Sequence, residues 1–348
     1  MNIQETNAPK VKKETKNKIR VEFDRTSFWK RFRLKYISWN FLGTVIWKIA
    51  RFLLLLGISY VILMPFFTKI SSSFMSADDF VDATVKLIPK YPTLATYKAI
   101  IRDNGYWTAL INSTILSLMC AVIQTLICAM IGYGFAKFKF KGNKILFAFV
   151  ILTMIVPHRT VQFSMFMQFS FFDIGNLLKI FTGKGIIEMI TGSSVKLINT
   201  FWPLALLSLT GLGFKNGLFI FMMRQYFRGV PDELEESAYL DGYGVVKTFV
   251  KIIIPLSVPM MITVFLFAFS WQWTDNFYTT IFFTTMGPKL LPTIVKIPSS
   301  LDTSVASNMF NAAVNNASAM LIIAPLIIIY LFCQRYLIQG IERSGIVG

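Results

Sequence analysis

The feature that most constrains this chain is a set of six long apolar runs. About 20 mostly apolar residues, wound as a helix, cross the hydrocarbon core of a membrane. Because no water reaches that core, a spanning segment must bond its own backbone groups, and a helix does so. The runs are Ile49–Phe67, Thr108–Phe135, Lys144–Met165, Phe201–Met223, Ile252–Thr274 and Asn315–Cys333. We therefore expect an all-α membrane protein with six transmembrane helices.

Composition and cysteine placement agree with a membrane protein. Of the 348 residues, 54% are hydrophobic and 15% are charged, whereas a soluble domain carries about 25% charged residues. Cys120, Cys128 and Cys333 all fall in apolar runs. That placement is typical of small buried hydrophobic residues and not of a disulfide framework or a metal site.

The formal net charge of +17 is concentrated before the first apolar run. The first 48 residues hold 12 Lys or Arg against 4 Asp or Glu. Membrane proteins keep such basic segments on the cytoplasmic side, so we interpret residues 1–47 as a cytoplasmic tail and expect no nucleic-acid binding. Six spans then place both termini in the cytoplasm. The cluster Lys137, Lys139, Lys141 and Lys144 falls on the same side and supports this orientation.

Part of the tail and three loops offer surfaces for contact. Within residues 27–41, aromatic side chains recur at helical spacing among Lys and Arg. This pattern fits an amphipathic helix on the inner membrane face, or else a basic juxtamembrane linker. The expected outside loops, 68–107, 166–200 and 275–314, are long for connectors, which suggests contact with something outside.

The chain lacks the sequence motifs of an ATPase, of a metal or catalytic site, and of a proton-driven carrier. The phosphate-binding pattern G-x-x-x-x-G-K-[ST] is absent, and Gly183-Lys184-Gly185 is only a fragment of it. His158 is the single histidine and has no partner for a metal site or a catalytic triad. Proton-driven carriers bury carboxylates in their spans, but here Asp275 stands only at the rim of the fifth. We expect no enzyme activity and no metal, and a pore that is either passive or driven by a partner.

In one expected inside loop, residues 224–255, the order of residues indicates the local structure. Pro231 suits a first helical position, and four carboxylates follow where the helix dipole favours negative charge. Asp241-Gly242 is a stop signal, because glycine accepts the left-handed conformation at a helix end. The pattern predicts a short acidic helix, a turn and a second helix that runs into the fifth span. Such a surface helix is suited to docking in a groove on another protein.

This loop resembles the cytoplasmic EAA loop of binding-protein-dependent ABC import permeases. Glu236, Ala238, Gly242, Ile252 and Pro255 match that pattern at its spacing. The mild departures are Ser237, in place of an alanine, and Ile254, in place of a leucine. Trp273-Thr274-Asp275 and the carboxyl end Gln334-Arg335-Tyr336 are similar to the maltose-type carbohydrate branch, although Thr274 departs from W-N-D.

The resemblance implies a fold, a set of partners and a coupling site. It implies a type I ABC importer permease fold over residues 48–348 in a bacterial cytoplasmic membrane. A second homologous permease, an ATPase dimer, an extracytoplasmic solute-binding protein and membrane lipid would be its partners. ATP and Mg²⁺ would be used by the ATPase and not be held by this chain. The residues at the ATPase contact would be Glu235, Glu236, Ser237, Ala238, Asp241 and Gly242.

The outer end of the fifth span is the candidate solute path. Trp271 and Asp275 are four residues apart, as are Gln272 and Asn276, so each pair shares a helix face. Sugars favour aromatic platforms and planar hydrogen-bonding groups, which also brings in Trp273. Gln124 and Asn112 of the second span are further candidates. The alternative is an interfacial aromatic belt with amides that bridge helices.

Other functions stay open on the sequence alone. The loop is equally compatible with an ABC permease for another small solute, such as a phosphorylated polyol or an amino acid. A self-sufficient channel or secondary carrier belongs to a different class and would transport without ATP. A membrane enzyme has the least support, because no candidate nucleophile, metal cluster or paired carboxylates are present.

Overall fold

The computed structural model describes residue 29 and residues 39–174, 185–284, 286–301 and 307–345. Its elements are α3 (Trp39–Ser72), α4 (Ala77–Val81), α5 (Ala95–Asp103), α6 (Tyr106–Lys137), α7 (Asn143–Ile155), η1 (His158–Val161), α8 (Gln162–Ser170), α10 (Ile186–Thr191), α11 (Trp202–Leu209), α12 (Asn216–Arg228), α13 (Glu233–Leu240), α14 (Val245–Thr248), η2 (Phe249–Ile253), α15 (Ile254–Trp273), α16 (Phe277–Phe282), η3 (Leu291–Ile294) and α17 (Ser307–Gly345). The basic tail and most of the proposed amphipathic segment 27–41 lie outside the described residues.

The chain divides into two compact units, residues 1–68 and 69–348. In the first unit, α3 is a long apolar helix whose leucines at 53–56 are all exposed. A helix that is apolar all round belongs in lipid or inside a larger assembly. This matches the expectation of a first span at Ile49–Phe67.

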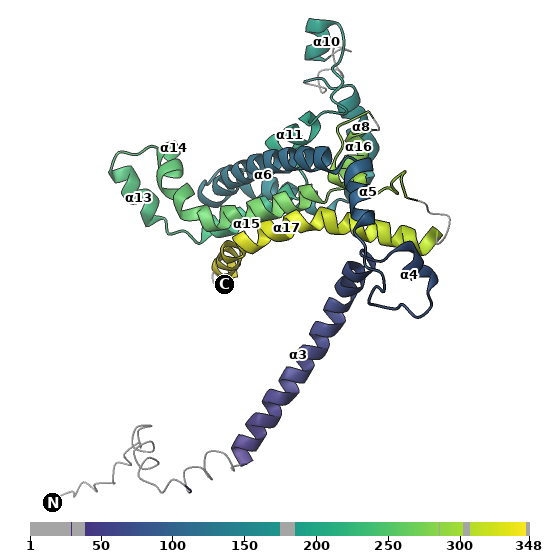
Figure 1. Ribbon diagram of the computed structural model, residues 1–348. Helices are drawn as coiled ribbons and strands as arrows, with labels where there is room; N and C mark the ends of the chain where they lie inside the picture. Colours follow the sequence, from purple (N-terminus) through teal and green to yellow (C-terminus); the bar gives the residue numbers. More distant parts are fainter. Residues whose placement is uncertain (1–28, 30–38, 175–184, 285, 302–306, 346–348) are drawn as a thin grey trace, which may run out of the picture. The chain divides into compact units, whose positions relative to one another are not determined.

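The second unit is a helical bundle centred on α6 (Figure 1). Helices α12 and α15 pack along α6, and α17 packs on α15. At Gly132 the backbones of α6 and α12 come so close that an added Cβ would lie 2.7 Å from Met223 Cβ and 2.9 Å from Arg224 N. Small residues permit this approach between membrane helices. Glycine at 132 is thus required by the packing of the bundle.

The expected all-α architecture is observed, but two of the six apolar runs are not continuous helices. Among the described residues, four helices are long and apolar enough to cross a membrane, or five if α7 and α8 form one bent span. Helices α7 and α8 meet at 93°, next to Pro157, which disfavours helix in the residue before it. The prediction of one helix over Phe201–Met223 is wrong, because residues 210–215 separate α11 from α12.

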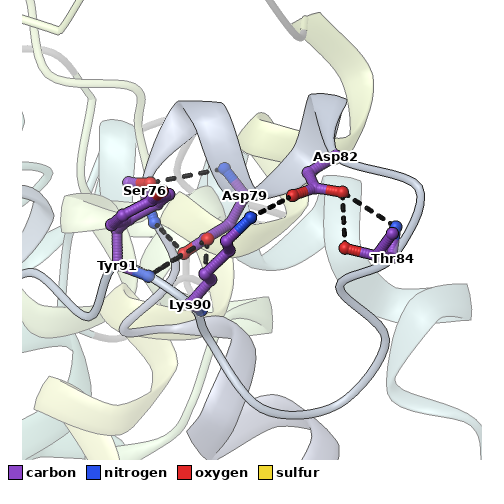
Figure 2. Close-up of polar contacts among 6 residues, drawn as sticks. All are labelled: Ser76, Asp79, Asp82, Thr84, Lys90 and Tyr91. Carbon is purple, nitrogen blue, oxygen red and sulfur yellow. Dashed lines mark hydrogen bonds and ion pairs between the residues drawn. The ribbon is translucent and has the colours of Figure 1, made fainter.

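The segment before α5 is held by a buried carboxylate (Figure 2). Asp79 is 2% exposed and accepts backbone N–H groups of Ser76, Lys90 and Tyr91. Ser76 Oγ in return accepts the Asp79 N–H, which completes a capping box at the start of α4. Residues 76–91 of the expected outside loop are thus folded around a polar centre.

A second carboxylate stabilises the same segment at its surface. Asp82 accepts hydrogen bonds from the N–H and hydroxyl of Thr84 and from Lys90 Nζ (Figure 2). Hydrogen bonds favour the charged form of a carboxylate, and those from Thr84 and Lys90 hold the pKa of Asp82 at about 2. The segment therefore keeps its charge pattern over the physiological range of pH.

Candidate coupling site and solute path

The acidic helix of the loop is α13, and it ends as predicted. Gly242 has φ +78°, and the Tyr243 N–H bonds to Ala238 O at 2.9 Å. A left-handed residue at a helix end satisfies the last carbonyls in this way. The start differs by two residues from the prediction, since the helix begins at Glu233 and Pro231 precedes it. The carboxylates of the first turn still lie at the positive end of the helix dipole.

The second helix of the loop runs without interruption into the long helix that follows. Val245–Trp273 forms one helical segment of 29 residues, made of α14, the π-turn η2 and α15. The Ile254 N–H bonds to Phe249 O, five residues back. Pro255 has no N–H to donate at the next position, so the wider turn falls where the α-helical ladder is interrupted anyway. Displacement of the loop can therefore pass along a single helix.

The predicted coupling residues divide into an outward and an inward set. Glu236, Ser237, Asp241 and Gly242 are exposed, whereas Glu235 and Ala238 are buried at 8% and 2% exposure. Two apolar side chains beside the outward set, Leu240 and Val246, are also exposed. Sequence reasoning missed both, although their place at the two sides of the Asp241-Gly242 turn was a usable signal.

A lysine from a distant helix holds the inward side of the loop. Lys137, in the last turn of α6, donates to Val230 O at 2.6 Å and to the Asp232 carboxylate. Its Nζ lies 3.7 Å from Glu235 Oε1, and its side chain is 6% exposed. The hydrogen bond and charge of Lys137 lower the pKa of Asp232. In the sequence Lys137 is only one positive charge in a cluster of four, whereas in the structure it tethers α13.

Tyr133, one turn before Lys137, joins the two flanks of the loop. Its ring centroid lies 5.6 Å from that of Phe227, at the end of α12, and 4.7 Å from that of Phe249, in η2. Aromatic pairs at such distances contribute beyond the apolar area they bury. The end of α6 therefore contacts the loop before, within and after α13.

At the opposite end of α15, two of the predicted path residues have structural partners. Trp273 is 2% exposed and donates its indole N–H to Ile322 O of α17 at 2.9 Å. Asp275 Oδ2 accepts the Thr279 N–H at 3.1 Å at the start of α16. Burial raises the pKa of the Asp275 carboxyl to about 6, and backbone hydrogen bonds oppose that rise. Both side chains organise the corner between α15, α16 and α17.

Trp271 faces a different environment, at the break between α11 and α12. It lines a cavity of about 140 Å³ together with His158, Lys215 and Asn216. Lys215 Nζ lies 5.6 Å from the centroid of the Trp271 ring, within the range of a cation–π contact. His158 packs against aromatic rings, with Phe214 at 5.5 Å. Lys215 and Asn216, which the sequence did not suggest, share this cavity with Trp271.

Unused polar atoms gather beside this break. Gln124 is 2% exposed and donates to Ser208 Oγ at 3.1 Å, while its Oε1 has no hydrogen-bond partner among the described residues. The same holds for Asn216 Oδ1, and for Gln272 Nε2 further along α15. Buried polar atoms without partners are costly, so these amides have capacity for water or a solute hydroxyl.

A larger pocket opens near the start of α6 and the end of α15. It encloses about 410 Å³ and is lined mostly by polar and charged side chains, among them Asp103, Asn104, Asn276, Thr279, Thr280, Lys289 and Lys296. Asn276 is the predicted path residue that reaches it. Asn112 instead bridges segments, since its amide donates to Lys289 O at 3.0 Å. No group of three or more potential metal ligands occurs in the described parts of the chain.

The family of binding-protein-dependent transport system inner membrane components matches residues 125–343. The chain belongs to this family. The expected kinship with ABC import permeases is confirmed, and the match includes the whole loop with α13. As a binding-protein-dependent transport component, the chain is a multi-pass membrane protein of a family of transporter subunits, not enzymes.

Individual members of the family show how far the similarity extends. The alpha-glucoside transport system permease protein AglG of Rhizobium meliloti is 30% identical over 74% of this chain, which spans 60% of the length of AglG. The arabinooligosaccharides transport system permease protein AraQ of Bacillus subtilis is 26% identical over 87% of this chain and 97% of its own.

Solved structures agree on the fold. A bacterial ABC transporter involved in the import of the acidic polysaccharide alginate contains a chain with a TM-score of 0.60 at 20% identity, over 84% of this chain and 97% of that one. A complex of the bacterial alginate ABC transporter with its alginate pentasaccharide-bound periplasmic protein gives a TM-score of 0.58 at 12% identity, over 89% of this chain and 98% of that one. The type I permease fold is therefore shared with a bacterial alginate ABC transporter.

Proposed function

We propose that this chain is one of two permease subunits of an ATP-driven importer for a carbohydrate, in particular an oligosaccharide. Several relatives support the solute class, since they are named for alpha-glucosides, arabinooligosaccharides and trehalose. An extracytoplasmic binding protein delivers the solute, and a separate ATPase dimer hydrolyses ATP with Mg²⁺. The observation that carries the proposal is the unbroken segment Val245–Trp273, which connects the exposed turn after α13 with the Trp271 cavity.

In this mechanism the exposed face of α13 occupies a groove on the ATPase. Closure of the ATPase around ATP displaces α13, and Lys137 and the α14–α15 helix carry the displacement to α6 and α15. The solute path opens to one side or the other according to which arrangement binds ATP and solute better. Glu236, Ser237, Asp241 and Gly242 make the contact, and Glu235 and Ala238 set the position of the helix.

The solute path uses the side chains that retain free polar capacity. Trp271 supplies an aromatic platform, and Gln124, Gln272 and Asn276 supply amides. Six spans with both termini in the cytoplasm follow if α7–α8 and α11–α12 each cross as a broken pair. Broken helices are tolerated in membranes where they line a polar cavity or are buried in protein.

The test is reconstitution of the whole assembly. The tagged chain is isolated in mild detergent and its co-purifying proteins are identified, after which the complex is placed in proteoliposomes. Uptake of labelled arabino-, gluco- and malto-oligosaccharides is measured with ATP or a non-hydrolysable analogue inside. We expect uptake that requires ATP, the binding protein and both permeases. Uptake by the single chain without ATP would instead establish a channel or secondary carrier.

A further inference from the structure

A strongly basic pocket lies beside the coupling loop and is not used by the mechanism above. It encloses about 920 Å³ between the end of α6, the α6–α7 turn and the end of α12. Five cations line it: Lys139, Lys141, Lys144, Arg224 and Arg228. None of the described residues that line the pocket is acidic. A pocket of this charge has a clear preference for an anion.

The arginine nearest the helices has unused donor capacity. The Arg224 guanidinium stacks 3.9 Å above the centroid of the Phe147 ring, and its buried Nε has no hydrogen-bond partner among the described residues. Arg228 follows one turn later on α12 and also lines the pocket, so the two positive charges lie close together. Two guanidinium groups that repel each other are stabilised when an anion binds between them.

The pocket lies at the boundary of the membrane. Helix α6 is long and apolar enough to cross the membrane and ends at Lys137, so the following residues 138–144 meet the headgroup layer. From the pocket, α7 leads away with no buried side chain, and Ile145, Phe149 and Leu152 are exposed. An anion site that continues into an exposed apolar helix face matches the two parts of a phospholipid.

We propose that this pocket binds the anionic headgroup of a membrane phospholipid whose acyl chains lie along α7. Basic pockets between membrane helices hold acidic headgroups in this way. A lipid at this place touches both the end of α6 and Arg224 of α12, two elements that flank α13. The site therefore makes the position of the coupling loop dependent on the acidic lipid content of the membrane.

Lipid binding is measured by native mass spectrometry on the complete transporter in detergent. The probes are phosphatidylglycerol, phosphatidylcholine with the same chains, and inorganic phosphate. We expect tighter binding of phosphatidylglycerol than of phosphatidylcholine, and no competition by phosphate at equal concentration. Each cation near an acidic membrane surface contributes about fivefold to affinity. Arg224→Gln with Arg228→Gln should therefore weaken phosphatidylglycerol binding by roughly 25-fold.

A second variant and a matched control distinguish weaker lipid binding from a folding defect. Lys141→Gln with Lys144→Gln changes only exposed side chains and should weaken binding to a similar degree. Lys247→Gln with Lys251→Gln removes two cations at exposed positions outside the pocket and should leave it unchanged. Equal binding by all variants, or displacement by phosphate, would overturn the proposal. So would the absence of bound phosphatidylglycerol from the complete transporter. The proposal needs only a membrane-embedded chain, so a negative result leaves the import function standing.

Discussion

The two ends of the segment Val245–Trp273 differ in how firmly they are held by the rest of the chain. At the loop end, an exposed helix is held from behind by a single buried lysine and a few aromatic contacts. At the other end, Trp273 and Asp275 are buried and hydrogen-bonded, and the cavity beside Trp271 is small, about 140 Å³. A helix with an exposed, weakly held end and a buried, hydrogen-bonded end can be displaced at the first while the second stays in position.

The largest expected effect comes from removal of the tether at the loop end. Lys137→Met leaves Glu235 buried without its cation, and an uncompensated buried charge costs about 3–5 kcal/mol. We expect transport to fall by more than tenfold and ATP hydrolysis to lose its dependence on the binding protein. ATPase and uptake assays on the same proteoliposomes measure both.

Lys98→Met is the control for the tether, because Lys98 is exposed and lies outside both the loop and the basic pocket. It should transport normally. Lys137→Arg should recover part of the activity, since it keeps the charge. Normal coupling in Lys137→Met would mean that the loop is positioned by the chain alone.

The next effect concerns the packing of α6 against α12. Gly132→Ala forces a Cβ to within 2.7 Å of Met223 Cβ, and overpacking costs about 1–3 kcal/mol. Thermal unfolding in detergent should shift to lower temperature. Gly134→Ala, two residues along the same helix with no atom within 4 Å of the added Cβ, should not shift it. Equal shifts for the two variants would contradict the close approach of α6 and α12.

A smaller effect is expected at the turn after α13. Gly242→Ala places a side chain at φ +78°, which costs about 1–2 kcal/mol, in a position with open space around it. The chain should remain folded, while the stimulation of ATP hydrolysis by the binding protein falls severalfold. Gly244→Ala has the same open space but an ordinary φ of −80°, and should leave stimulation intact.

The smallest effects separate the two tryptophans at the firm end. Trp273→Phe loses the hydrogen bond to Ile322 O, worth about 0.5–1.5 kcal/mol, and should lower the unfolding temperature without changing the KM for solute. Trp271→Ala should raise KM severalfold, whereas Trp271→Phe keeps a ring and should recover most of the affinity. If Trp273→Phe changes KM and Trp271→Ala does not, the solute path lies on the other face of α15.

The loop was the part most open to prediction. Its carboxylates, Gly242 and prolines act locally, so their sequence order alone predicts the helix, the turn and the continuous second helix. The tether was not predictable, because Lys137 lies 95 residues before Asp232 and only the packing of α6 brings them together.

The sequence contains residues that indicate the two helix breaks, but the high hydropathy of both runs led to the prediction of continuous helices. Pro157 follows Val156, and Gly211 and Gly213 stand within the fourth run. Gly211 has φ +75°, and an added Cβ at Gly213 would crowd Gln124, Ser208 and Asn216. The averaged apolarity of the window concealed both interruptions. The spacing of Trp271 and Asp275 suggested that Asp275 lines a solute path. Its hydrogen bond with the Thr279 N–H could not be predicted, because it depends on the turn between α15 and α16.

The π-turn at Phe249–Ile253 sets the rotation of the Trp271 end of the segment Val245–Trp273 relative to its loop end. One residue more per turn changes the direction of every later side chain by about 100° relative to the loop. Deleting a single residue there would leave each end locally intact, yet Trp271 would face a different neighbour for the same position of α13. The π-turn therefore determines which neighbours Trp271 meets for a given position of α13.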